Sequence, residues 1–155
     1  MKSITKAICA LAVIATLAMA ADKPNFSGEW KMNLAKSMLG PMPAPTSFTR
    51  KVTHAEPSLT IADDQKGGAG DLSYTRQYTT DGKEIAYQAN GADVKGGATW
   101  DGDAIVIRSQ AKVGELDLVI TDKITLTDGG KTLSDVVHIE LPQGAFDLTY
   151  VFDKQ

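Results

Sequence analysis

The feature that most constrains the fold is an Asp-Gly or Asn-Gly pair that recurs between short segments rich in β-branched and aromatic residues. In Thr99–Arg108, the turn Asp101-Gly102-Asp103 separates an apolar run ending at Trp100 from a second run beginning at Ala104. Glycine reaches positive φ without steric cost, so these pairs favour the tight turn of a β-hairpin. The same unit recurs at Thr80-Asp81-Gly82-Lys83, Asn90-Gly91-Ala92-Asp93 and Thr127-Asp128-Gly129-Gly130-Lys131. The sequence therefore predicts a series of hairpins.

Residues 1–20 have the pattern of an export signal. Lys2 and Lys6 give a basic start, Ala7–Ala18 is small and apolar apart from Thr16, and Ala18-Met19-Ala20 matches a signal cleavage site. The apolar run is shorter than the roughly 20 residues that a membrane-spanning helix needs. We expect a signal peptide over residues 1–20 and one domain over residues 21–155. The mature protein would then be secreted, either periplasmic or extracellular, with no integral membrane segment.

Composition excludes several classes of partner and chemistry. The chain carries 16 Lys and Arg against 19 Asp and Glu, and cleavage would remove two of the lysines, so no basic patch suggests nucleic acid. The single cysteine, Cys9, leaves with the signal, so the domain has no disulfide or thiolate. His54 and His138 are the only histidines, and neither has a second histidine at ligand spacing. We expect a monomer with no metal and no cofactor.

Period-two alternation predicts the strands. Asn33 is expected to cap a short helical turn over residues 34–39, followed by an extended proline-rich connection over residues 41–45. Short turns leave no room for the crossovers that parallel strands need. The predicted fold class is all-β: one up-and-down antiparallel β-barrel of about ten strands, closed on itself. The ten predicted strands are 28–33, 47–54, 58–64, 72–79, 84–89, 94–100, 104–112, 117–126, 132–141 and 146–152.

The residues of the first predicted strand resemble a motif of a known protein family. Gly28-x-Trp30 followed by an up-and-down barrel resembles the calycins, that is, lipocalins and fatty-acid-binding proteins. The order of a helical interruption, further strands, Trp100-Asp101-Gly102 and a terminal aromatic strand is similar to the fatty-acid-binding branch. The opening Asn25-Phe26-Ser27-Gly28-x-Trp30-Lys31 also resembles exported bacterial lipocalin-like proteins. The resemblance implies a structural role for Gly28, Trp30, Trp100, Asp101 and Gly102.

The departures from that family concern the ligand. Fatty-acid-binding proteins hold a carboxylate with an Arg-x-Tyr on the last strand, whereas this chain has Tyr150-x-Phe152. Arg108 is the nearest counterpart of their second arginine, but it lies one residue closer to Trp100, and a one-residue slip reverses the face. The helix-turn-helix lid is replaced by a short turn, where Met38, Leu39 and Met42 either cover an entrance or close the barrel end.

Charged residues fall on inward positions of the predicted strands. Arg76 lies between Tyr74 and Tyr78, and Asp122 lies between Ile120 and Ile124. Buried charges are unfavourable unless they are paired, so two hypotheses follow. In the first, Arg50, Arg76 or Arg108 recognises a polar or anionic ligand end near Tyr150. In the second, these arginines pair with Asp122 and Asp135 or lie in solvent at strand ends.

The aromatic residues on the same faces either line a pocket or fill the barrel, and Asp63-Asp64 is expected to be a solvated strand end. Trp30 is expected to plug the barrel base. His138 should face solvent, because it alternates away from Val137 and Ile139. The candidate ligand-binding residues are Phe48, Arg50, Tyr74, Arg76, Tyr78, Tyr87, Arg108, Asp122, Tyr150 and Phe152.

These patterns predict a non-catalytic carrier whose partner is a small apolar or amphipathic molecule. Two alternatives stay open. The first is an enzyme, an isomerase or hydrolase, that uses Tyr150, Arg76 or Asp122 in the lumen. The second is a solid barrel that binds a protein or envelope component through its loops. An open pocket with few polar groups favours the carrier, and titratable groups with perturbed pKa values converging on the pocket favour the enzyme. A filled lumen favours the interaction module.

Overall fold

The computed structural model describes residues 22–155, and the predicted signal peptide lies outside this range. The described part is built almost entirely of strands and also contains two short 3₁₀ turns. No helix in it is long and apolar enough to cross a membrane. The strands are β1 (Gly28–Met32), β2 (Pro45–Ala55), β3 (Ser58–Gly67), β4 (Leu72–Thr79), β5 (Ile85–Ala89), β6 (Ala92–Asp101), β7 (Ala104–Val113), β8 (Leu116–Thr127), β9 (Thr132–Leu141) and β10 (Gly144–Lys154).

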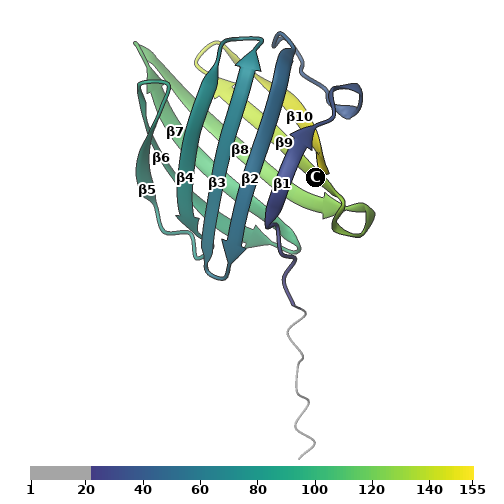
Figure 1. Ribbon diagram of the computed structural model, residues 1–155. Helices are drawn as coiled ribbons and strands as arrows, with labels where there is room; N and C mark the ends of the chain where they lie inside the picture. The colour runs from purple at the N-terminus through teal and green to yellow at the C-terminus, as the bar shows by residue number, and fades with distance from the viewer. Residues whose placement is uncertain (1–21) are drawn as a thin grey trace, which may run out of the picture.

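All ten strands belong to one antiparallel sheet in the order β4-β3-β2-β1-β10-β9-β8-β7-β6-β5. Each strand therefore pairs with its neighbour along the chain, except for β4 and β5, which share no ladder. β1 also pairs with β10, which brings the two ends of the domain together. Figure 1 shows the sheet curling around a common interior. The predicted all-β, up-and-down antiparallel barrel of ten strands is confirmed.

The predicted closure of the barrel is wrong in one place. β4 and β5 lie at the two ends of the sheet order and share no ladder, so the barrel is nearly closed. Three tyrosines fill this seam from the inside. Tyr74 of β4 stacks on Tyr87 of β5 with the ring centroids 6.4 Å apart and the planes 5° apart. The hydroxyl of Tyr78 donates a hydrogen bond of 3.1 Å to that of Tyr87.

The turns behave differently at the four predicted Gly-containing sites. Asn90 and Gly91 take φ values of +50° and +75° between β5 and β6, as expected of a two-residue hairpin turn. Gly102 and the Asp128-Gly129-Gly130 turn also join paired strands. Thr80-Asp81-Gly82-Lys83 does not form a hairpin. Asp81 instead makes an isolated bridge to Thr99 on β6, so this segment crosses the seam.

The helical turn after β1 is shorter than predicted. It is a 3₁₀ turn over Leu34–Lys36, and the Asn33 side chain accepts a hydrogen bond from the Lys36 backbone amide, as the cap prediction required. The chain then runs beside β10, where Met38 and Thr149 exchange two backbone hydrogen bonds. Since this segment must pair with β10, the helix cannot continue to residue 39.

The interior is divided along the barrel axis. The end that carries the β2–β3 and β6–β7 turns is filled by a hydrophobic core. The other end carries the turns β3–β4, β5–β6, β7–β8 and β9–β10, and its interior is hollow. The core residues, each less than a tenth exposed, are Phe26, Trp30, Phe48, Val52, Leu59, Ile61, Tyr78, Ala98, Ile105, Ile107, Ile124, Leu133 and Phe152.

Candidate functional site

A layer of buried charge separates the packed end from the hollow end. Its centre is Arg50 on β2, whose Nε and Nη2 donate to Asp63 Oδ1 and Oδ2 at 2.6 and 3.0 Å. Nη1 of Arg50 donates to Asp135 Oδ2 on β9 at 2.7 Å. All three residues are at most 3% exposed. Period-two alternation places these side chains on the inner face, and the register of the strands brings them to the same height.

Arg76 on β4 extends this layer across the barrel. Its Nη2 donates to Asp63 Oδ2 at 2.9 Å, and its Nη1 lies 3.8 Å from Asp122 Oδ2 on β8. Both residues are buried. Five charged groups on β2, β3, β4, β8 and β9 thus form one network, which we call the charge layer: Arg50, Asp63, Arg76, Asp122 and Asp135.

The environment shifts the charge-layer pKa values in opposite directions. Burial alone would lower the pKa of Arg50, but Asp63 and Asp135 raise it well above its usual range. Burial would raise the pKa of Asp63, yet the two guanidinium groups outweigh this and lower it. For Asp122, burial and then the nearby Asp135 carboxyl raise the pKa to about 7. Burial and the neighbouring carboxyl therefore favour the protonated form of Asp122.

Beyond the charge layer lies a cavity of about 280 Å³. Arg50, Gln65, Arg76, Ser109 and Asp122 contribute its polar lining. Asn90 in the β5–β6 turn and Val113 at the end of β7 also line it. Its volume is just below the roughly 300–1,000 Å³ that is typical of small-molecule sites. Most of its wall is apolar or aromatic: Phe48, Leu72, Tyr74, Tyr87, Val94, Ala111, Leu118, Ile120, Val137, Ile139, Leu148 and Tyr150.

Two polar atoms at this lining lack a hydrogen-bond partner among the described residues. They are Nε of Arg76 and Oγ of Ser109, and a third such atom is Oδ1 of Asp135. Ser109 faces Gly96 on β6, where a Cβ atom would lie only 2.5 Å from Oγ, so glycine provides the space that the hydroxyl occupies. A buried polar group without a partner is unfavourable by roughly 1–3 kcal/mol. Arg76 and Ser109 thus bring one unpartnered donor and one unpartnered hydroxyl to the wall of the cavity, both buried beneath its surface.

The structure brings most of the predicted site residues together. Phe48, Arg50, Tyr74, Arg76, Tyr87, Asp122 and Tyr150 line the cavity. Burial raises the pKa of Tyr150 to about 12, so its phenol stays neutral in the physiological range. Tyr78 and Phe152 lie instead in the packed core. The hypothesis that the arginines pair with Asp122 and Asp135 is confirmed for Arg50, which pairs with Asp135, and for Arg76, which approaches Asp122.

The placement of Arg108 in the lumen is wrong. Its side chain is 59% exposed and lies 3.7 Å from Glu140 on the outer face. Ile105 and Ile107 point inward, so the strand parity that places them in the core turns residue 108 to solvent.

The expectation that Asp63 is solvated is also wrong, since Asp63 is 2% exposed and Asp64 is the half-exposed member of the pair. Asp63 lies on the same face of β3 as Leu59 and Ile61, so alternation along the strand predicts that it faces inward. Ser109 was missed as well, although it shares the inward parity of Ile105 and Ile107.

The predicted structural residues lie at the packed end. Trp30 is 1% exposed, and its Nε1 donates to the Phe26 carbonyl at 3.1 Å. Trp100 packs on Phe26 and His54 and donates to Glu56 Oε1, so this aromatic ring is not part of the cavity wall. Gly28 takes φ of +153°, and a Cβ atom there would meet the Lys154 side chain at 2.8 Å.

The Asp101-Gly102 turn is held from outside by Lys123, whose ammonium lies 2.8 Å from Asp101 Oδ2. His138 faces solvent beside Asp147, as predicted. Residues 22–155 contain no group of three or more His, Cys, Asp or Glu side chains placed to hold a metal ion.

Met38, Leu39 and Met42 do not line the cavity. Met38 is 68% exposed beside β10, so its side chain does not cover the entrance.

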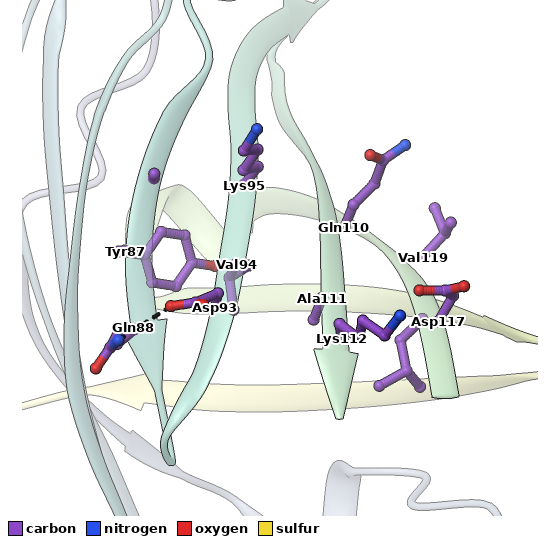
Figure 2. Close-up of a pocket in the computed structure, with 12 residues that line it drawn as sticks. Tyr87, Gln88, Asp93, Val94, Lys95, Gln110, Ala111, Lys112, Asp117 and Val119 are labelled. Carbon is purple, nitrogen blue, oxygen red and sulfur yellow. Dashed lines mark hydrogen bonds between the residues drawn. The ribbon is translucent and has the colours of Figure 1, made fainter. Parts of the chain in front are cut away.

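A larger hollow of about 690 Å³ lies along β5–β8 (Figure 2). Its long side chains, among them Lys95, Gln110 and Lys112, are exposed, and Gln88 donates to Asp93 at 3.0 Å. None of the described residues with a buried unpartnered polar atom lines it. It is therefore a solvated groove, and the smaller cavity beside the charge layer is the candidate site.

Solved structures share this arrangement of strands. A zebrafish ileal bile acid-binding protein complexed with cholic acid aligns with a TM-score of 0.61 at 14% identity, covering 84% of this chain and 98% of that chain. A fatty-acid-binding protein from Manduca sexta gives 0.54 at 17% identity, with 83% and 98% covered. Human cRBP IV gives 0.55 at 11%, with 85% and 99% covered. No protein-family model matches the sequence, and no curated protein matches it.

At these identities the likeness shows the fold alone. The fold is that of the calycins in the form taken by fatty-acid-binding proteins, which confirms the resemblance drawn from Gly28-x-Trp30 and the strand order. The likeness to exported bacterial lipocalin-like proteins stays a prediction.

Proposed function

We propose that the protein is a non-catalytic carrier that holds one small amphipathic molecule in the cavity beside the charge layer. The apolar body of the ligand packs against Phe48, Leu118 and Ile120, and its polar end meets Arg76 Nε and Ser109 Oγ. The observation that carries the proposal is this pairing of a mostly apolar wall with two buried unpartnered polar atoms. The fold neighbours lend support, because one is described as bile acid-binding and another as fatty-acid-binding.

The two alternatives have weaker support. A solid interaction module requires a filled lumen, but the barrel is filled only at the end that Trp30 and Phe152 occupy. An enzyme would need a titratable group that serves a substrate, and Asp122 is the candidate. Its raised pKa already follows from burial and from Asp135, and structural ion-pair networks perturb pKa values in this way.

The carrier is proposed to act after export. The support is the pattern of residues 1–20, a basic start, an apolar run and a small-residue cleavage site. N-terminal sequencing of the protein from its own host should begin at Ala21, and the protein should be found in the periplasm or the medium. A mature protein that begins at Met1 in the cytoplasm contradicts this part of the proposal.

Native mass spectrometry with a cavity-filling variant tests the binding site. Ala111 on β7 lines the cavity, and Ala111→Phe places a ring in its volume. Ala86→Phe on β5 is the matched control, because residue 86 is exposed on the outer face. We expect the wild type and Ala86→Phe to retain a small molecule from the host, or to bind added 1-decanol, and Ala111→Phe to do neither. Equal binding by both variants places the ligand elsewhere and contradicts the proposal.

A further inference from the structure

The charge layer contains more acid than base. Two guanidinium groups, on Arg50 and Arg76, face three carboxyl groups, on Asp63, Asp122 and Asp135. Arg50 directs Nε, Nη1 and Nη2 to two of the carboxylates, so its charge is already compensated. A ligand in the cavity therefore meets a layer whose positive charge is fully matched.

The geometry at the cavity lining selects the polar group of the ligand. Arg76 Nε is a buried donor without a partner, and only an acceptor atom can satisfy it. Ser109 Oγ can either donate or accept, and a protonated Asp122 carboxyl can donate. A hydroxyl or carbonyl oxygen satisfies these groups. A carboxylate satisfies them too, but it adds a further negative charge beside Asp122, which is buried.

We propose that the cavity selects molecules with an apolar body and an uncharged oxygen end, such as an alcohol, over carboxylates of the same chain length. This inference rests on the proposed carrier function and names its ligand class. Arg50 and Arg76 are already paired with carboxylates of the protein, so they are not free to bind a carboxylate of the ligand. The discrimination follows from the desolvation and repulsion that a buried, unpaired carboxylate suffers.

The selectivity should depend on pH through Asp122. Below its pKa of about 7 the carboxyl is neutral, and above it the added charge strengthens the repulsion of a ligand carboxylate. On β7, the register partner Ile107 and the inward-facing Ser109 carry no charge. The charged and titratable groups that act on Asp122 are Arg50 on β2, Asp63 on β3, Arg76 and Tyr74 on β4, Asp135 on β9 and Tyr150 on β10.

Calorimetric titration with 1-decanol and with decanoate tests the inference. At about pH 9 we expect the wild type to bind 1-decanol at least about tenfold more tightly than decanoate. At about pH 6 this ratio should shrink, because Asp122 takes up a proton. Asp122→Asn should strengthen decanoate binding about tenfold at the higher pH and leave 1-decanol binding nearly unchanged.

Asp117→Asn is the matched control, since residue 117 lies on the same strand and is exposed. We expect it to change neither affinity. Decanoate binding as tightly as 1-decanol at both pH values overturns the inference and leaves the carrier function standing. If neither compound binds the wild type, both the inference and the carrier function fail.

Discussion

Arg50 and Asp63 form a two-bond ion pair in the middle of the barrel, with Nε–Oδ1 and Nη2–Oδ2 distances of 2.6 and 3.0 Å. Asp63 also accepts a hydrogen bond from Arg76, so one carboxylate joins β2, β3 and β4. The pair is buried, and its partners inside the barrel are Arg76 on β4 and Asp135 on β9. It sets the boundary between the packed core and the cavity.

Asp63→Asn should therefore destabilise the protein strongly. The substitution leaves two buried guanidinium groups with less compensating charge, and breaking such a pair costs about 3–5 kcal/mol. Urea unfolding measures the loss. Asp64→Asn is the control, because Asp64 is half-exposed and its only ion-pair partner among residues 22–155 is Lys66 at 3.3 Å. Its loss should therefore be below about 1 kcal/mol. Equal losses at the two positions would refute the central role of Asp63.

Asp122 should make the free energy of unfolding decrease as the pH rises. Its pKa is about 7 in the folded protein and about 3.9 in the unfolded chain, so the folded state holds the proton more tightly. This contribution is complete below the unfolded pKa and is lost as the pH rises through about 7. Asp63, whose pKa is lowered, acts in the opposite direction and loses its contribution as the pH falls.

Asp122→Asn should remove the first of these two effects. Between about pH 4 and about pH 8, the free energy of unfolding of the variant should rise relative to that of the wild type. Urea unfolding at a series of pH values measures the difference. Two parallel curves would show that Asp122 has the same pKa in the folded and unfolded states.

The tyrosine seam should control the dynamics of β5. This strand pairs only with β6, and Tyr87 holds its other side against Tyr74 and Tyr78. Aromatic pairs contribute about 0.5–1.5 kcal/mol each, so Tyr87→Ala should speed amide hydrogen exchange in residues 85–89 by at least about tenfold. Gln88→Ala, on the outer face, is the control and should leave exchange nearly unchanged. Unaltered exchange in Tyr87→Ala would mean that the seam is held by other contacts.

Trp30 should matter for stability but not for the ligand. Its ring lies at the packed end and does not line the cavity, so Trp30→Ala should lower the free energy of unfolding by about 3–5 kcal/mol. The affinity of the folded variant for 1-decanol should stay within a factor of about two, because the charge layer separates the two regions. A large loss of affinity in the folded protein would show that the two halves are coupled.

The observed positions of the charged residues show which of them the sequence can place on the inner or outer face. Alternation was sufficient to place Arg50, Arg76 and Asp122 inside, because a strand's parity is a local property. The same rule places Arg108 outside and Asp63 inside, but a family counterpart and an acidic pair suggested otherwise. Strand parity alone predicts the observed face of both residues.

Other features depend on contacts between distant segments. The pairing of Arg50 with Asp135 requires the register of β1 with β10 and of β9 with β10, which no short window of sequence contains. The open seam between β4 and β5 is likewise a property of the whole sheet. The turn Thr80-Asp81-Gly82-Lys83 has hairpin residues, but its partner turned out to be Thr99 on β6.

The measurement that tests the carrier function most directly is a crystal structure of the protein purified from its own host. We predict electron density for one small molecule in the cavity between Tyr74, Ser109 and Tyr150, with an oxygen atom within hydrogen-bond distance of Arg76 Nε. Density for a ligand in the outer groove of β5–β8, or a cavity closed by its own side chains, would contradict the account.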